Sequence, residues 1–195
     1  PRSMLIKLSN LCNLKCIMCN QEKSNVQDIN KKILSLIIEN LKYMEKIIWQ
    51  GGEPLIIPYF KELLLNTSKY QHIHQIVITN FQKVSDEILN LVVKNKVHLV
   101  ISIDGATRKT YEKIRQGASF DKLIQNIEKI NGLTKDIFLQ INFVVMKENY
   151  FEMFEILEFA YRYNFKMITF IEKSSILSKI RKTSLNEKEI DVIKD

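Results

Sequence analysis

Two kinds of segment alternate along the 195 residues of this chain. Short apolar, β-branched runs predict strands, and they cover residues 4–9, 46–50, 73–79, 97–103, 138–145 and 167–171. Longer stretches with helical spacing lie between them, at residues 29–44, 59–68, 86–94, 120–133 and 150–163. Six such alternations predict βα units and a parallel sheet. Six strands are too few for a closed eight-stranded barrel. Right-handed crossovers leave a doubly wound sheet and a curved partial barrel both open.

Composition is that of one ordinary globular domain, with 46% hydrophobic and 26% charged residues. No apolar run approaches the roughly 18 residues that a membrane span requires, and no signal-peptide pattern opens the chain. The net charge of +7 comes from lysines spread along the whole sequence, so it indicates a solvated surface more than a nucleic-acid site. The densest basic run, residues 173–182, is predicted to be a helix with a charged face.

Unusual residues gather where the predicted strands end. Ligands of parallel α/β folds bind at the carboxyl ends of the strands, so these positions are candidates for a site. The first strand leads into a cysteine cluster, and the next three end at Gln50-Gly51-Gly52-Glu53-Pro54, Thr79-Asn80 and Ser102-Ile103-Asp104-Gly105.

Strand parity places several polar side chains on one face of the sheet. Ser102 and Asp104 alternate with aliphatic residues that helices are expected to cover, and Gln140 and Asn142 do the same in the following strand. Polar groups on an apolar sheet need hydrogen-bond partners. Either a polar ligand supplies them, or these side chains satisfy one another.

All three cysteines of the chain, Cys12, Cys16 and Cys19, fall within eight residues. An odd number argues against a disulfide framework. The spacing would suit one face of a helix with buried cysteines, or a zinc site completed by one of the histidines, although nothing points to a particular histidine. A fourth interpretation is an iron–sulfur cube, in which three thiolates would leave one iron open for chemistry.

The sequence C-N-L-K-C-I-M-C resembles the CxxxCxxC motif of the radical S-adenosylmethionine (radical SAM) superfamily. Gly-Gly-Glu-Pro follows at the end of the next predicted strand, and residues 102–117, S-I-D-G-A-T-x-x-T-Y-x-x-I-R-x-G, are similar to the branch that often carries a C-terminal SPASM or twitch domain. The resemblance covers about residues 4–172. It implies a partial (β/α)6 TIM-like barrel of parallel strands with outer helices.

The resemblance also implies a [4Fe–4S] cluster and S-adenosylmethionine as cofactors. Three irons would be held by Cys12, Cys16 and Cys19, and the fourth by the amino and carboxylate groups of S-adenosylmethionine. The resemblance implies that Gly51, Gly52 and Glu53 bind the amino group of S-adenosylmethionine and that Arg115 binds its carboxylate. Ser102 and Asp104 would hold the ribose or carboxylate end. Met18 would contact adenine, Asn142 would contact the nucleoside, and Asn80, at the end of the third strand, would also bind the cofactor.

Some of these assignments have a structural alternative. Arg115 could instead be a helix-surface arginine. Asn149 also matches the branch, but its capping-box spacing with Glu152 predicts a helix N-cap, which we prefer. Gln50 resembles a substrate-side residue of sulfatase-maturing members, and Gln140 is a second substrate candidate. Asn80 is followed by Phe81, where the family often has glycine.

The activity implied by the resemblance is reductive cleavage of S-adenosylmethionine to a 5′-deoxyadenosyl radical, which abstracts hydrogen from a peptide or protein side chain or from a small metabolite. The electron would come from a donor such as flavodoxin or ferredoxin, and oxygen-sensitive clusters favour the cytoplasm. The alternatives are an RNA-modifying radical SAM enzyme and a non-catalytic iron–sulfur or zinc module. Because no further cysteines are present for auxiliary clusters, we expect residues 1–195 to be a core domain truncated before a SPASM/twitch-type or other C-terminal extension.

Overall fold

The computed structural model describes residues 2–20 and 25–172. Its sheet has six parallel strands in sequence order. They are β1 (Ser3–Lys7), β2 (Lys46–Gln50), β3 (His74–Thr79), β4 (His98–Ser102), β5 (Leu139–Val145) and β6 (Met167–Glu172). Each strand is hydrogen-bonded to the next, and β1 and β6 form the two edges. The predicted strands are therefore confirmed to within a few residues at their ends.

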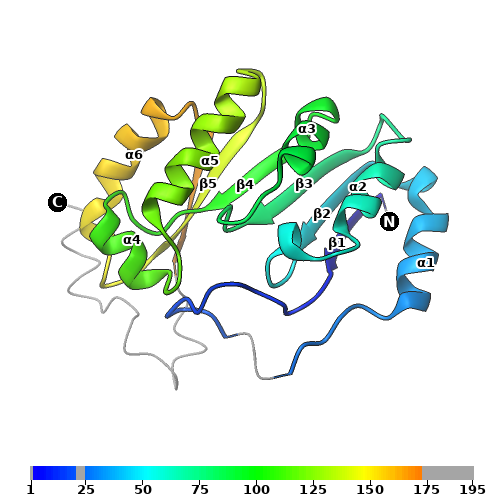
Figure 1. Cartoon of the computed structure of the whole chain (residues 1–195), viewed down its shortest axis with the longest axis horizontal. Coiled ribbons are helices and arrows are strands. Elements are labelled where there is room, and N and C mark those ends of the chain that lie inside the picture. Colours follow the sequence, from blue (N-terminus) through cyan, green and yellow to red (C-terminus); the bar gives the residue numbers. More distant parts are fainter. Residues whose placement is uncertain (1, 21–24, 173–195) are drawn as a thin grey trace.

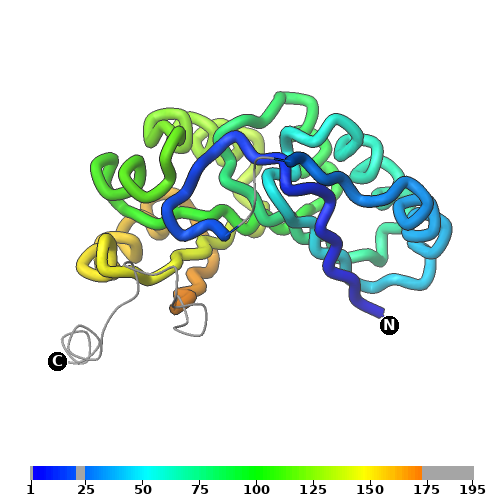
Figure 2. Tube along the Cα trace, turned by 90° about the horizontal axis from the view of Figure 1, so that it is seen from below, coloured from blue at the N-terminus to red at the C-terminus, as the bar shows by residue number. Residues whose placement is uncertain are grey.

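Helices connect the strands on one side of the sheet. They are α1 (Lys31–Glu39), α2 (Phe60–Thr67), α3 (Asp86–Lys94), α4 (Arg108–Ile114), α5 (Phe120–Leu133) and α6 (Met153–Arg162), with 3-10 turns η1 (Leu41–Tyr43), η2 (Pro54–Ile56) and η3 (Tyr150–Glu152). The sheet curves into an arc with the helices along its outer, convex side (Figures 1 and 2). This is the partial (β/α)6 barrel that the resemblance implied, and not a sheet with helices on both faces.

The hydrophobic core lies between the outer face of the sheet and the helices. In β4, Leu99 and Ile101 are fully buried in this core, while Val100 faces the concave side. In β5, Leu139 and Ile141 belong to the same core. The predicted alternation is confirmed, because the aliphatic residues that flank the polar ones are those that the helices cover.

Three local expectations were wrong. The predicted helix 29–44 is divided, since α1 ends where the side chain of Asn40 donates to the carbonyl of Leu36 (2.7 Å), and η1 follows. Residues 108–114 form α4, which was not among the predicted helices. Asn149 begins η3 but its side chain makes no capping bond; it accepts from the Met146 N–H (2.7 Å) and donates to the Asp104 carbonyl (3.1 Å).

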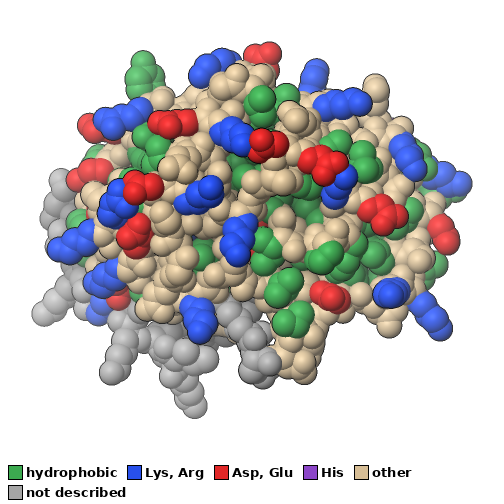
Figure 3. All heavy atoms as spheres, viewed as in Figure 1, with side chains coloured by type: hydrophobic (Ala, Val, Ile, Leu, Met, Phe, Trp, Pro, Cys, Tyr) green, Lys and Arg blue, Asp and Glu red, His purple; other side chains and the backbone are tan. Residues whose placement is uncertain are grey.

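None of the helices in the described chain is long and apolar enough to cross a membrane. Lysines and arginines are interspersed with acidic side chains over the face shown in Figure 3. The predicted helix 173–182 lies outside the described residues.

Candidate functional site

The cysteines lie on a long loop that leaves β1 at the carboxyl edge of the sheet. The base of this loop is closed, because Ser9 forms an antiparallel bridge with Asp28. Asn10 reinforces the closure: its side chain accepts from the Gln27 N–H (2.7 Å) and donates to the Asn25 carbonyl (2.8 Å). The two ends of the loop are thereby held together.

The turn after β2 packs directly against the cysteine loop. The Glu53 N–H donates to the Leu11 carbonyl at 2.7 Å. Gly51 and Gly52 have φ angles of +96° and +52°, and a Cβ on Gly52 would lie 2.0 Å from the Leu11 oxygen. Only glycine tolerates both the left-handed backbone and this close approach. The two glycines therefore have a structural reason to be here, separate from the cofactor contact that the resemblance implies.

The far side of the loop is held by the end of α4. The Lys15 N–H donates to the Gln116 carbonyl (2.8 Å), and the Ile17 N–H donates to the Ile114 carbonyl (3.0 Å). The loop consequently runs across the mouth of the arc, from β1 toward α4 (Figure 2). Backbone bonds to two separate elements fix its path.

The three cysteines border one hollow of about 230 Å³, together with Leu14, Met18, Gly52, Asn80 and Arg115. None of the cysteines forms a disulfide, and Cys12 and Cys16 are partly buried while Cys19 is exposed. They lie on a non-helical loop, so the interpretation as buried cysteines on one helix face is wrong.

The donor set of this hollow suits a cluster better than a single ion. Within residues 2–20 and 25–172, no three His, Cys, Asp or Glu side chains lie close enough together to hold one metal ion. An iron–sulfur cluster is held by cysteine thiolates, and the three thiols would not have to share one metal ion. Three thiols around one hollow therefore fit such a cluster.

Arg115 follows α4 and reaches back toward the cysteines. Its side chain is buried, so the helix-surface alternative is wrong. One guanidinium nitrogen, Nη2, lies 2.6 Å from Asp104 Oδ2, and Nη1 lies 4.0 Å from Cys16 Sγ. Asp104 Oδ1 accepts from the Val144 N–H at 2.7 Å. Desolvation raises the pKa of Asp104, although the charge of Arg115 and the Val144 N–H counteract it.

Glu53 is also buried, but its carboxylate turns toward β3. Its Oε1 accepts from the Thr79 hydroxyl (2.5 Å) and the Leu55 N–H (3.1 Å), and its Oε2 accepts from the Asn80 N–H (2.6 Å). Burial raises the pKa of Glu53 to about 7, against the lowering effect of these hydrogen bonds. Glu53 does not border the cysteine hollow. In this structure it ties the turn after β2 to the end of β3.

Asn80 connects the end of β3 to the cysteine loop. Its side-chain Nδ2 donates to Asn13 Oδ1 at 3.0 Å and lies 3.9 Å from Cys12 Sγ. The next residue, Phe81, is fully buried with a φ of +56°, a conformation that usually requires glycine. Phe81 stands where the family often has glycine, and this difference in the sequence could have indicated the strained backbone.

The remaining predicted residues lie on the concave face of the sheet. Ser102 and Asn142 are half-buried neighbours in the register of β4 and β5. Gln140 Nε2 donates to Asn142 Oδ1 (3.2 Å) and to Thr169 Oγ1 (2.9 Å), so these polar side chains satisfy one another. Gln50 is half-buried at the end of β2.

Sequence reasoning missed the role of Glu152. This buried carboxylate accepts from the Ala106 N–H (2.7 Å), from the N–H (3.2 Å) and hydroxyl (2.7 Å) of Thr107, and from the Thr110 hydroxyl. It joins η3 to the start of α4, and so supports the helix whose end holds the cysteine loop. No sequence pattern indicated these contacts, since the capping-box spacing pairs Glu152 with Asn149 instead.

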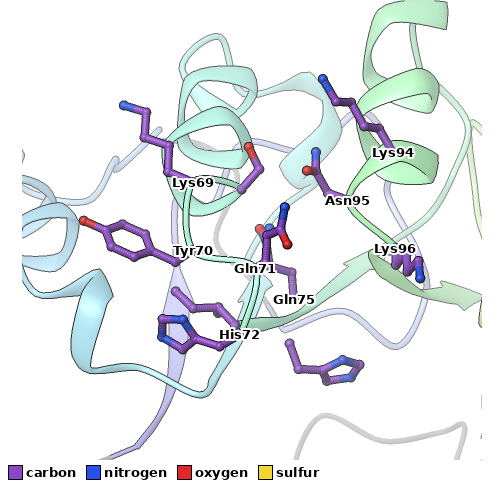
Figure 4. Close-up of a pocket in the computed structure, with 11 residues that line it drawn as sticks. Lys69, Tyr70, Gln71, His72, Gln75, Lys94, Asn95 and Lys96 are labelled. Atoms are coloured by element: carbon purple, nitrogen blue, oxygen red, sulfur yellow. The ribbon is translucent and has the colours of Figure 1, made fainter.

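A larger hollow, of about 570 Å³, lies where β3 begins, at the amino ends of the strands. Its lining includes Lys69, Lys94, Lys96 and Gln75, which Figure 4 labels. The amino ends of parallel strands in such barrels serve stability, and the chemistry lies at the carboxyl ends. The smaller hollow beside the cysteines is therefore the candidate active site.

Comparison with known proteins agrees with this geometry. A model of the Radical SAM superfamily matches residues 6–160. The chain belongs to this superfamily. Its members use a [4Fe–4S] cluster and S-adenosylmethionine, and the three cysteines that border one hollow fit that chemistry.

The curated relatives are about twice as long as the part that this chain matches. A GTP 3′,8-cyclase of Clostridium perfringens (strain SM101 / Type A) is 28% identical over 166 residues, which are 80% of this chain and 51% of the relative. The mycofactocin maturase MftC of Mycobacterium tuberculosis (strain ATCC 25618 / H37Rv) is 26% identical over 168 residues, 84% and 42% of the two chains.

Solved structures share the fold. SuiB of Streptococcus suis bound to the precursor peptide SuiA superimposes with a TM-score of 0.80 at 21% identity, covering 100% of this chain and 44% of SuiB. The protein anSMEcpe with bound AdoMet gives 0.73 at 22% identity, covering 88% and 51%. Both confirm the partial barrel.

Proposed function

We propose that this chain is the core of a radical SAM enzyme that acts on a peptide or protein side chain. The observation that carries the proposal is the set of three thiols on one loop, which borders a single hollow at the carboxyl edge of the barrel. Cys12, Cys16 and Cys19 would hold three irons, and the fourth iron would be left to bind S-adenosylmethionine. When bound, the cluster and S-adenosylmethionine supply one-electron chemistry that ends in hydrogen abstraction.

The side chains around the hollow would bind and orient S-adenosylmethionine. Arg115 and Met18 border the hollow, where they would take the carboxylate and the adenine. Gly51 and Gly52 let the turn after β2 pack closely against the backbone around the cysteine loop, and their carbonyl oxygens would accept from the amino group.

The residues on and beside the concave face divide into three groups. Ser102 and Asn142 are half-buried there and would contact the nucleoside. Asp104 and Glu53, which are buried and already hydrogen-bonded, would act indirectly: Asp104 would hold Arg115, and Glu53 would hold the turn at Gly52. Gln50 and Gln140 would lie on the substrate side.

The relatives favour a peptide substrate. SuiB is solved with a precursor peptide, MftC is named a maturase, and anSMEcpe has been solved with bound peptides. The GTP 3′,8-cyclases favour a second candidate, a small nucleotide metabolite. A reduced flavodoxin or ferredoxin would supply the electron, and the cytoplasm would suit an oxygen-sensitive cluster.

The proposal is tested by anaerobic reconstitution with iron and sulfide, followed by addition of S-adenosylmethionine and dithionite and quantification of 5′-deoxyadenosine. We expect production by the wild type and none by Cys16→Ala, whose circular dichroism should match the wild type. The exposed serine of α1 gives a control, Ser35→Ala, which should retain activity. Full activity in Cys16→Ala, or reconstituted iron that never supports cleavage with any reductant, would contradict the proposal.

A further inference from the structure

Arg115 bridges the sheet and the cysteine loop, although it belongs to neither. Its guanidinium lies 2.6 Å from Asp104 Oδ2 through Nη2 and 4.0 Å from Cys16 Sγ through Nη1. Only 6% of Arg115 and none of Asp104 is exposed to solvent. A cation is therefore held beside one of the cysteine sulfurs, away from water. Its Nε is buried with no hydrogen-bond partner in the described part of the chain.

We propose that Arg115 sets the reduction potential of the cluster, through its position against Cys16. The inference rests on the proposed function, because it requires that the cysteines hold a [4Fe–4S] cluster. Arg115 is then a positioning residue for the electron-transfer step, in addition to any contact with S-adenosylmethionine. In that step the cluster gains one electron from the external reductant, and no bond forms or breaks.

The direction of the effect follows from charge. Reduction adds one negative charge to the cluster, and a buried guanidinium stabilises the more negative state, because water screens it poorly. Hydrogen bonds to the cluster sulfurs act in the same direction. Arg115 is therefore expected to make the cluster easier to reduce.

Asp104 modulates this effect in two opposing ways. It holds Arg115 in place, and it is itself fixed by the Val144 N–H at 2.7 Å. Its negative charge also offsets part of the charge of Arg115 at the cluster. Replacing it with asparagine keeps an oxygen for the Val144 N–H and removes the offsetting charge, so the two partners should move the potential in opposite directions.

The three sulfurs have different surroundings. The Cys12 sulfur accepts a hydrogen bond from the Leu14 N–H at 3.5 Å and lies 3.9 Å from Asn80 Nδ2. Cys19 is exposed, and within residues 2–20 and 25–172 no hydrogen-bond donor lies against its sulfur. The charged contact is made to Cys16, so the effect of Arg115 is separable from those of the neutral donors at Cys12.

The experiment is a redox titration of the reconstituted protein, followed by EPR and performed without S-adenosylmethionine. We expect Arg115→Gln to disfavour reduction about tenfold, which for a one-electron couple is a potential about 59 mV more negative. Asp104→Asn should shift the potential in the positive direction. Arg108→Gln is the matched control, because it removes the same charge from the exposed start of α4, where Arg108 pairs with Asp121; its potential should equal that of the wild type.

Two further outcomes complete the test. Arg115→Lys keeps the charge, so a potential closer to the wild type than that of Arg115→Gln supports the inference even if the glutamine variant binds less iron. An unshifted potential in fully loaded Arg115→Gln, or shifts of the same sign in Arg115→Gln and Asp104→Asn, would overturn it. If the wild type assembles no cluster, the proposed function is refuted. If the wild type and Arg115→Gln both assemble a cluster and their reduction potentials are equal, this inference alone is refuted.

Discussion

Gly52→Ala tests how the turn after β2 and the cysteine loop depend on each other. The new Cβ would lie 2.0 Å from the Leu11 oxygen and 2.7 Å from the Leu11 carbonyl carbon, so one backbone must move. The φ of +52° adds about 1–2 kcal/mol of strain for a residue with a side chain. Loss of the hydrogen bond from the Glu53 N–H to the Leu11 carbonyl adds about 0.5–1.5 kcal/mol.

We therefore expect Gly52→Ala to lower the free energy of unfolding by about 2–3 kcal/mol. Since the displaced backbone carries Cys12, the reconstituted variant should also bind less iron. Urea denaturation of the apoprotein measures the first effect, and iron content after reconstitution measures the second.

The chain supplies a matched control at another glycine. A Cβ on Gly132, in α5, would meet nothing within 4 Å. Gly132→Ala should leave iron content unchanged and stabilise the protein by up to about 1 kcal/mol, because alanine loses less entropy in a helix. Wild-type stability and iron content in Gly52→Ala would refute the account of this turn.

Substitutions at three further positions probe the support of the site. The pKa of Glu53 is about 7 in the folded protein and 4.5 in the unfolded chain, so the folded protein holds the extra proton and its stability should fall as pH rises between these values. Urea titrations at several pH values should show the free energy of unfolding fall by about 3 kcal/mol in the wild type and not in Glu53→Gln. The same pH dependence in both proteins would disprove this role of Glu53. Phe81 has a φ of +56°, which glycine adopts without strain, so the Phe81→Gly protein should be more stable than the Phe81→Ala protein by about 1 kcal/mol. Thermal denaturation measures this difference, and a more stable Phe81→Ala protein would contradict the strain. Glu152→Ala should destabilise the protein by about 2–3 kcal/mol, because it leaves the N–H groups of Ala106 and Thr107 without their acceptor; a loss below 0.5 kcal/mol, as expected of a surface residue, would argue against that role.

The architecture was predictable because the signals for it are local. Each strand is a short apolar run, and the connecting helices other than α4 have apolar residues at helical spacing. Alternation within β4 and β5 also predicts that Ser102, Gln140 and Asn142 lie on the sheet face opposite the helices, which is the concave face. The cysteine spacing marked the loop, since all three thiols of the chain fall within eight residues.

The interactions that hold the site together were not predictable, because they join residues distant in the sequence. Asp104 and Arg115 meet only because α4 turns the chain back toward the cysteines. The spacing around Asn149 predicted a helix cap, yet the side chain binds the strand ends of β4 and β5 instead. A local pattern gives residue types that suit a cap, and tertiary contacts decide which backbone groups they bind.

Whether the three cysteines leave one iron open to S-adenosylmethionine is tested by Mössbauer spectroscopy of the protein reconstituted with ⁵⁷Fe, before and after S-adenosylmethionine is added. Three thiolates on a four-iron cube leave one iron with a different ligand set. We expect about a quarter of the iron signal to change when S-adenosylmethionine binds, and the rest to stay as it was. A spectrum in which every iron is equivalent and unaffected by S-adenosylmethionine would contradict this expectation.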